Sequence, residues 1–413
     1  MDMNRPDRAD CIAADATDGL AERRARFSLP ADVIYLDGNS LGASQAAVGA
    51  RIRTVIDEEW GVGLIRSWND AGWVDLPRRI AGKLAPLVGA APDELAVTDS
   101  TSANLFKALA SARSLRPDRG VLLTDDANFP TDVYVARGLA DLVGDLEVRV
   151  VPTLEVLDHL DTDVAVVTLT HVDYRTGRLH DPVAITRAVH DAGALMVWDL
   201  SHSAGALDVD LTAWDADLAV GCTYKFLNGG PGSPGYVFVA RRWHDQAGTP
   251  VKGWFGHDAP FAFAPDYRPA PGAERFANGT PPVLSMAALD TALDAFRGVG
   301  PEALAAKADA LTDRFIALVD ARCGDRIELS SPRDAAWRGA QVSLRHDHAY
   351  AVTQAMIARG VIGDHRPPDI VRFGFAPLYV RHVDVFDAVE HLADLLATDG
   401  WDRPEYHARR TVT

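Results

Sequence analysis

Short apolar runs alternate with amphipathic stretches through the middle of this chain. The runs have the length of buried strands, and the stretches between them carry apolar residues at the three-to-four-residue spacing of a helix face. This pattern predicts strands at residues 95–98, 121–124, 164–169, 195–199, 218–221 and 236–240. Strands that alternate with helices predict a mostly parallel sheet with helices on both faces, which is an α/β fold.

The two ends of the chain have a different pattern of apolar and polar residues. The first 30 residues predict an exposed helical arm, followed by a short strand at 33–36 and a helix at 44–60. After Pro281-Pro282 the pattern predicts helices at 284–296, 301–321 and 383–398, with strands at 341–344 and 370–375. We therefore expect a large domain at residues 45–295. A smaller α+β domain would combine residues 1–44 with residues 296–413.

Composition limits the classes of function. A chain of 413 residues with 47% hydrophobic content can bury a large core, and its net charge of −17 argues against nucleic acid or an anionic membrane as a partner. Its three cysteines lack metal-ligand spacing, so we expect reduced thiols and a cytoplasmic location. No apolar run is long enough to predict a transmembrane helix.

Asp199 and Lys225 carry the strongest chemical signal. Asp199 ends one predicted strand, and Lys225 follows the next strand within Thr223-Tyr224-Lys225. The 26 residues between them (225 − 199) are about one β-α-β unit, so both side chains are expected at the same edge of the sheet. A lysine that forms a Schiff base and an acid that pairs with a pyridinium nitrogen suit pyridoxal 5'-phosphate (PLP).

Further polar and aromatic residues follow other predicted strands. Thr101 and Ser102 lie between the strand at 95–98 and a helix at 103–109, where free amides favour an anion such as phosphate. Phe129 and Thr170 come after the strands at 121–124 and 164–169. Ligands of open α/β sheets bind outside the carboxyl ends of the strands, so these positions converge on one site.

Each of these residues also has a structural interpretation. Lys225 could extend its stem along apolar surface, Asp199 could cap a helix, and His202 could simply pack in the turn that follows Asp199. The pair His346 and His348 resembles a metal cluster, but the spacing is more typical of a solvated loop, and we predict no metal site.

Three further segments of the chain carry specific motifs: Asn39-Ser40-Leu41-Gly42, Gly253-Trp254-Phe255-Gly256 and Arg372-Phe373-Gly374-Phe375-Ala376-Pro377-Leu378-Tyr379. With these segments the chain resembles the kynureninase family of fold-type-I PLP enzymes, and the resemblance covers nearly the whole chain. The Asp199…His202 and Tyr224-Lys225 motifs are shared by the wider superfamily of PLP-dependent transferase-like folds.

The resemblance implies a role for each matching residue. Lys225 would bond PLP covalently, Asp199 would pair with the ring nitrogen, and Tyr224 would transfer a proton. Arg372 would bind the substrate carboxylate, with Trp68 and Asn39 also on the substrate side. The remaining cofactor contacts would be Thr101, Ser102, Phe129, Pro130, Thr131, Asp132, Thr170, His202, Trp254 and Thr280. The alignment leaves open whether Asn278 takes the place of Thr280.

The resemblance implies hydrolysis of the Cβ–Cγ bond of L-kynurenine to anthranilate and L-alanine by a homodimer with its active site at the subunit interface. It leaves open whether 3-hydroxykynurenine is a substrate and which residues the partner supplies. A related PLP lyase or cysteine desulfurase is the alternative, although neither Cys222 nor Cys323 lies in a segment that predicts a mobile nucleophile. A noncatalytic binding protein would not need Lys225, Asp199 and Arg372 together.

Overall fold

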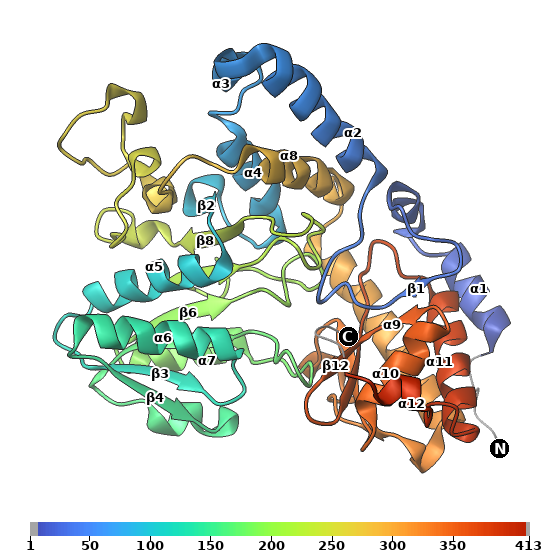
Figure 1. Cartoon of the computed structure of the whole chain (residues 1–413). Helices are drawn as coiled ribbons and strands as arrows, with labels where there is room; N and C mark the ends of the chain where they lie inside the picture. Colours follow the sequence, from blue (N-terminus) through green and yellow to red (C-terminus); the bar gives the residue numbers. More distant parts are fainter. Residues whose placement is uncertain (1–6, 410–413) are drawn as a thin grey trace.

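The computed structural model describes residues 7–409 and is built around a seven-stranded sheet (Figure 1). β8 is antiparallel to both of its neighbours, and the remaining pairs are parallel. In spatial order the strands are β2 (Leu95–Thr98), β8 (Gly235–Val239), β7 (Leu218–Gly221), β6 (Leu195–Asp199), β5 (Val164–Thr170), β3 (Val121–Asp125) and β4 (Glu147–Val151).

The six strands predicted from apolar runs are all present, with bounds that differ by at most one residue at an end. The expectation was wrong to omit β4, which forms an edge of the sheet. Its sequence Glu147-Val148-Arg149-Val150-Val151 leaves four of the five residues partly or fully exposed, so it has no apolar run. An edge strand with one solvent-exposed face has a much weaker apolar pattern in its sequence than a buried strand has.

Helices cover both faces of the sheet, as the alternating pattern predicts. In β6, Leu195 and Val197 pack into one apolar cluster with α5 (Thr101–Ser114) and α6 (Pro130–Val143). The intervening Met196 and Trp198 pack into the other cluster, with α7 (Pro182–Asp191). Successive side chains of a strand point to opposite faces, so a strand buried on both sides reads as an uninterrupted apolar run.

A long arm projects from the upper edge of the molecule (Figure 1). The predicted helix at 44–60 is present as α2 (Ala46–Thr54), which continues without a break into a π-helical stretch, η2 (Val55–Gly63). The short α3 (Ser67–Asp70) completes the arm. α4 (Leu76–Leu84) and α8 (Val283–Ala292) lie beside the arm, and α8 packs against both α2 and α4.

The C-terminal region forms a second, smaller sheet. Its order is β12 (Asp364–Arg366), β13 (Ile370–Gly374), β10 (Gln341–Arg345) and β9 (Glu328–Leu329), with all pairs antiparallel. The helices of this region are α9 (Pro301–Arg322), α10 (Ala349–Ala358), α11 (His382–Ala397) and α12 (Pro404–His407).

The N-terminal segment lies against the C-terminal region (Figure 1). α1 (Arg8–Ala16) packs on α11, and β1 (Ile34–Tyr35) pairs with β11 (Val361–Ile362). This pairing agrees with a small domain made from both ends of the chain, while the boundaries at residues 45 and 295 stay predictions. Within residues 7–409, no helix has both the length and the apolar character needed to cross a membrane.

Candidate active site

A pocket of about 320 Å³ opens where the carboxyl ends of neighbouring strands meet. β5 ends at Thr170 and β6 at Asp199, and these two residues are paired in register across the sheet. Lys225 follows the end of β7, the next strand over. The pocket is lined by Ser40, Thr101, Ser102, Phe129, Thr131, Asp132, Thr170, Tyr174, Asp199, Ser201, His202, Tyr224, Lys225, Arg366 and Arg372. Eleven of these residues are sites that the sequence predicts.

Lys225 points at a buried histidine. Its Nζ atom lies 2.9 Å from Nε2 of His202, whose Nδ1 lies 3.1 Å from Oε1 of Gln341. The amide nitrogen of Gln341 donates to two backbone carbonyls, which fixes its oxygen toward the imidazole. Nδ1 of His202 therefore carries the proton, and Nε2 is free to accept from Lys225. Burial, followed by the charge of Lys225, holds the pKa of His202 well below its usual range.

Two buried carboxyl groups lie side by side in the pocket. Burial raises the pKa of Asp132 well above its usual range, and the neighbouring Asp199 raises it further. Oδ2 of Asp132 is buried and has no hydrogen-bond partner in the described chain. Asp199 accepts from the backbone N–H of Ser201 at 2.6 Å. The two carboxyl groups can therefore accept a hydrogen bond from a further donor or bind a cation.

A helix N-terminus forms another side of the pocket. Ser100 caps α5 by accepting from the backbone N–H of Ala103, and Thr101 and Ser102 occupy the first turn. Oγ1 of Thr101 is buried without a partner in the described chain. Free amides, the positive end of the helix dipole and an unused hydroxyl together favour an anion such as phosphate.

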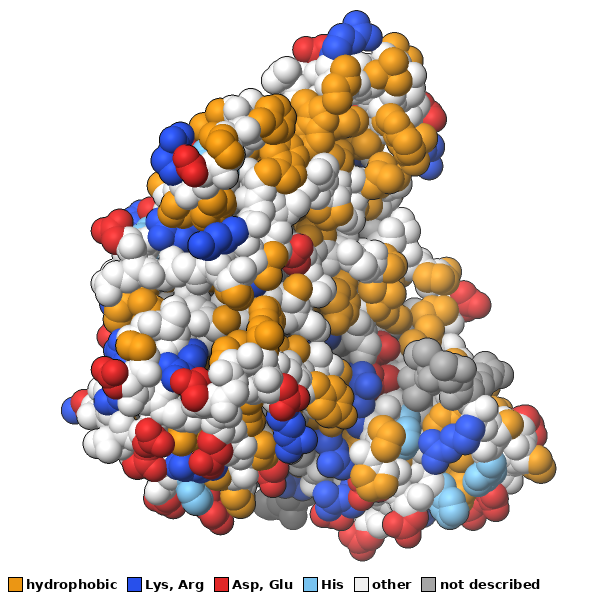
Figure 2. All heavy atoms as spheres, turned by 60° about the vertical axis from the view of Figure 1, so that its left-hand side comes forward, with side chains coloured by type: hydrophobic (Ala, Val, Ile, Leu, Met, Phe, Trp, Pro, Cys, Tyr) orange, Lys and Arg blue, Asp and Glu red, His pale blue; other side chains and the backbone are white. Residues whose placement is uncertain are grey.

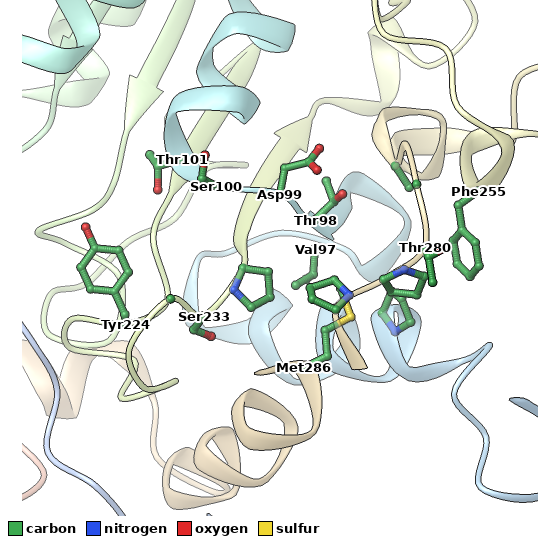
Figure 3. A pocket seen from close by; sticks show the side chains of 17 residues that line it. Val97, Thr98, Asp99, Ser100, Thr101, Tyr224, Ser233, Phe255, Thr280 and Met286 are labelled. Atoms are coloured by element: carbon green, nitrogen blue, oxygen red, sulfur yellow. The ribbon is translucent and has the colours of Figure 1, made fainter. Parts of the chain in front are cut away.

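Thr101 and Tyr224 also line a second cavity, of about 410 Å³. Figure 3 shows Tyr224 and Thr101 on one side of this cavity and Thr280 with Phe255 on the other. Thr280 thus lies across the cavity from the α5 N-terminus. It does not reach the first pocket within this chain.

The loop before α5 is anchored to the segment that precedes Thr280. Asp99 has a left-handed backbone (φ 44°), and its carboxylate accepts from Lys107 Nζ and from the Asn278 amide, each at 2.7 Å. Lys107 is buried on α5 and also donates to the carbonyl of Phe276 at 2.6 Å. The Asn278 amide nitrogen is thus held by Asp99, and which of Asn278 and Thr280 contacts a ligand stays a prediction.

Arg372, on β13, is fully buried by its neighbours. Its Nε and Nη2 atoms form a two-point ion pair with Asp364 at 2.8 and 2.5 Å, and Nη2 also donates to Ser40 at 2.9 Å. Nη1 donates to the carbonyl of Tyr174. With its amide oxygen turned toward the guanidinium, Asn39 accepts from Nε at 2.9 Å. Asn39, predicted on the substrate side, thus contacts Arg372 and does not line the pocket, and its role toward the substrate stays a prediction.

Three other predicted residues lie outside the first pocket. Trp68 packs against Trp73 and Phe255, at ring-centroid distances of 5.9 and 6.4 Å. Trp254 packs against Phe255, Phe261 and Phe263. Pro130 is the first residue of α6, directly after Phe129. The roles of these residues stay predictions.

Four residues that line the pocket are not predicted from the sequence: Ser40, Tyr174, Ser201 and Arg366. Ser201 is two residues after Asp199, and Ser40 lies within the Asn-Ser-Leu-Gly segment, so proximity to known motifs could have found both. Tyr174 and Arg366 lie in segments without a local signal. Among residues 7–409, no three or more histidine, cysteine or acidic side chains are grouped so that they could hold a metal ion. His346 and His348 therefore belong to no such group.

Comparison with known proteins assigns the family. A kynureninase from Burkholderia mallei (strain SAVP1) is 53% identical over 414 residues, which cover 98% of this chain and 99% of that protein. The chain belongs to the kynureninase family. A kynureninase from Pseudomonas fluorescens is 50% identical over 413 residues, with the same coverage. The model of the kynureninase C-terminal domain matches residues 304–392.

Solved structures confirm the predicted fold class beyond the kynureninase family. A cysteine desulfurase from Thermococcus onnurineus NA1 superposes with a TM-score of 0.74 at 19% identity, over 91% of this chain and 98% of that one. A cysteine desulfurase from Escherichia coli gives 0.75 at 17% identity, over 92% and 98%. At such identities the likeness concerns the fold and not the reaction.

Proposed function

We propose that this chain is a PLP-dependent hydrolase that cleaves L-kynurenine to anthranilate and L-alanine. The observation that carries the proposal is the convergence of Lys225, Asp199 and Arg372 on one pocket in a chain that is 53% identical to a kynureninase over its whole length.

The residues of the pocket fit PLP. The Asp132–Asp199 pair leaves a buried carboxyl oxygen without a partner, which suits a cationic ring nitrogen. The α5 N-terminus and the unused hydroxyl of Thr101 suit a phosphate. Phe129 lies at the pocket wall with its ring centroid 6.0 Å from Lys225 Nζ, where an aromatic ring can stack on a flat heterocycle. When bound, PLP supplies an aldehyde that bonds to amines and a ring that accepts electron density.

We infer that Lys225 moves the Cα proton. When its Nζ atom is not bonded to the cofactor, it would be free to act as a base within the same pocket. Nε2 of His202 at 2.9 Å accepts a hydrogen bond from this amine and holds it in position. The histidine is uncharged, so it does not repel the amine while a proton is transferred.

Tyr224 is the candidate for proton transfer at the substrate carbonyl. It precedes Lys225 and lines both cavities, and burial raises the pKa of its hydroxyl. The hydroxyl therefore stays protonated at neutral pH and can donate to an oxygen atom of the reacting ketone or of the diol formed by water addition. Arg372 would orient the substrate through its carboxylate, for which a guanidinium is suited.

The cysteine desulfurase alternative has less support. Such an enzyme needs a cysteine thiol that reaches the substrate. Cys222 and Cys323 are both buried, and burial raises the pKa of each thiol. Neither is placed to act as a nucleophile.

The deciding experiment follows anthranilate fluorescence after addition of L-kynurenine to the PLP-loaded protein. We expect release by the wild type and none by Lys225→Ala, with Lys252→Ala as a control for loss of an exposed lysine. Absence of anthranilate from PLP-loaded wild type would refute the substrate assignment. Borohydride reduction followed by peptide mapping should place the cofactor on Lys225.

We further propose that the enzyme is a homodimer whose partner subunit completes the active site. Large apolar side chains are exposed along the arm, with Trp60 at 57%, Leu64 at 59% and Ile65 at 76% exposure, and Figure 2 shows hydrophobic atoms gathered there. A patch of this kind marks an interaction surface. Trp68, Trp254 and Thr280 lie outside the first pocket of one chain, which supports their contribution from a second copy.

Sedimentation tests this assembly. Ile65→Glu should convert the dimer to a monomer and weaken PLP retention. Leu154→Glu is the matched control, because Leu154 is equally exposed (76%) on η6, the turn at Thr153–His159. Dimers that persist in Ile65→Glu at low micromolar concentration would exclude the arm as the interface.

A further inference from the structure

Two guanidinium groups, not one, face the candidate pocket. Arg372 on β13 and Arg366 on β12 both line it, and both bond to the same two side chains, Asp364 and Ser40. The resemblance to kynureninases assigns binding of the substrate carboxylate to Arg372 alone. The hydrogen bonds that each arginine already makes indicate that binding of the carboxylate is divided between the two residues.

Arg372 has little left to donate. Of its five N–H groups, the one on Nε and the two on Nη2 are taken by Asp364 and Ser40, and one on Nη1 is taken by the carbonyl of Tyr174. Its side chain is 0% exposed. A single N–H remains on Nη1, whereas a two-point grip on a carboxylate needs two.

Arg366 has the donors that Arg372 lacks. Its Nη2 bonds to Asp364 at 2.6 Å and to Ser40 at 3.1 Å, but its Nε is buried without a partner in the described chain. Its Nη1 has no partner within residues 7–409 either and is not buried. The side chain is 30% exposed, and it forms part of the pocket wall.

Asp364 fixes the positions of both guanidinium groups. Its Oδ2 accepts from Arg366 at 2.6 Å and from Arg372 at 2.5 Å, and Ser40 at 2.7 Å gives it a third donor. Although burial opposes ionisation of Asp364, the adjacent Arg372 lowers its pKa, so it stays charged. Asp37 lies close by, and burial together with Asp364 raises the pKa of Asp37 to about 7. At neutral pH Asp364 is therefore charged and Asp37 only partly charged beside two guanidinium groups, so a net positive charge remains for a ligand.

We propose that Arg366 is a second residue that binds the substrate carboxylate, sharing it with Nη1 of Arg372, and that Asp364 is a positioning residue for both guanidiniums. One carboxylate oxygen takes the remaining N–H of Arg372, and the other takes Nη1 of Arg366. This inference rests on the proposed function, because the proposed substrate that binds in the pocket is an α-amino acid.

An equilibrium titration tests the contact without depending on turnover. The PLP-loaded protein is titrated with L-alanine, which has the carboxylate, and with L-alaninamide, which lacks its charge, and cofactor absorbance is followed. In Arg366→Gln, the Kd for L-alanine should rise about 10- to 100-fold, the loss expected for a hydrogen bond to a charged group. The Kd for L-alaninamide should change less than about 3-fold.

Two further variants make the result specific. Arg366→Lys keeps the charge and should recover part of the affinity for L-alanine. Arg345→Gln is the control, because Arg345 lies on β10 of the same sheet, pairs with Asp369 and Glu328 and does not line the pocket. It should leave both affinities unchanged.

The outcomes separate this inference from the proposed reaction. Equal weakening for both ligands in Arg366→Gln would show a structural role, and unchanged binding of L-alanine would show no contact. Either result overturns the inference. Failure of the wild type to form anthranilate would instead refute the reaction, whatever the ratio of the two affinities.

Discussion

Nζ of Lys225 lies 2.9 Å from Nε2 of His202, and Gln341 fixes which imidazole nitrogen faces the amine. His202 lies in the turn after β6 of the large sheet, and Gln341, 139 residues away in sequence, lies on β10 of the small sheet. The hydrogen-bond direction of the candidate catalytic amine is therefore set where the two sheets meet. A change in how the C-terminal region packs would alter it directly.

His202 should remain uncharged across the physiological pH range. Burial is the main cause of its lowered pKa, and the charge of Lys225 is the second. We expect a ¹⁵N NMR titration of the cofactor-free protein to show neutral imidazole from about pH 5 to 8, with the proton on Nδ1. In Lys225→Met the pKa of His202 should rise but stay below about 6.5, because burial remains.

Lys252→Met is the control for that titration, since Lys252 is exposed and outside the pocket. It should leave the resonances of His202 unmoved. A His202 signal that titrates with a pKa near 6.5 in the wild type would contradict the assignment of a buried neutral histidine.

How much of this site the sequence predicts depends on where each residue lies. Asp199, Phe129 and Thr170 were predictable, because each comes at the carboxyl end of a buried strand and such ends share one edge of the sheet. Arg366 was not predictable, because it reaches the pocket from the small sheet through contacts with Ser40, 326 residues away. Apolar periodicity reports which face of an element is buried, but not which distant element packs on it.

The same limit applies to the edges of the fold. β4 was missed because exposure of one face removes the apolar run on which the prediction depends. Trp68 and Trp254 matched family motifs, yet within one chain they pack against Phe255 and not in the pocket. Motif resemblance identifies residue types and positions, and it does not state which subunit's pocket they enter.

The buried carboxyl of Asp132 should make stability fall as pH rises. Its pKa is raised in the folded protein, first by burial and then by Asp199, so folding takes up a proton. This contribution to stability is complete below the unfolded pKa of about 4 and is lost as pH rises toward the folded pKa. Asp132→Asn should therefore stabilise the cofactor-free protein at pH 8, with a gain that shrinks toward pH 4.

Urea unfolding at a series of pH values measures this gain. Asp118→Asn, a change at an exposed aspartate, should show no such pH dependence. A gain for Asp132→Asn that is constant with pH would mean that the carboxyl ionises normally. Adding PLP should reduce the gain, because a cationic ring nitrogen would stabilise the charged pair.

Chemical modification should find no reactive thiol in the native protein. Cys11, Cys222 and Cys323 are all buried, and burial raises the pKa of each thiol. We expect Ellman's reagent to react slowly with the folded enzyme and with three thiols after denaturation. Anthranilate formation should survive alkylation under native conditions. One fast-reacting thiol whose modification abolishes activity would favour the desulfurase alternative.

Lys107 should couple the phosphate-binding end of α5 to the segment that carries Thr280. Its side chain is 1% exposed, and it joins Asp99 to the carbonyl of Phe276. Lys107→Met keeps the volume but leaves Asp99, whose side chain is 30% exposed, without its cation. Because Asp99 retains contact with water, we expect a loss of about 1–3 kcal/mol in the free energy of unfolding, less than for a fully buried pair.

The matched control is Lys83→Met. Lys83 bridges Asp290 and Asp294 and is 24% exposed, and Asp290 keeps a second cation in Arg79 at 3.1 Å. Its removal should therefore cost about 0–1 kcal/mol. Lys107→Met should also weaken PLP binding several-fold, because the left-handed backbone at Asp99 sets the direction in which the next residues enter α5. Lys83→Met should not affect PLP binding. If the two variants lose equal stability and bind PLP as the wild type does, Lys107 is an ordinary ion-pair residue and the loop holds its shape without it.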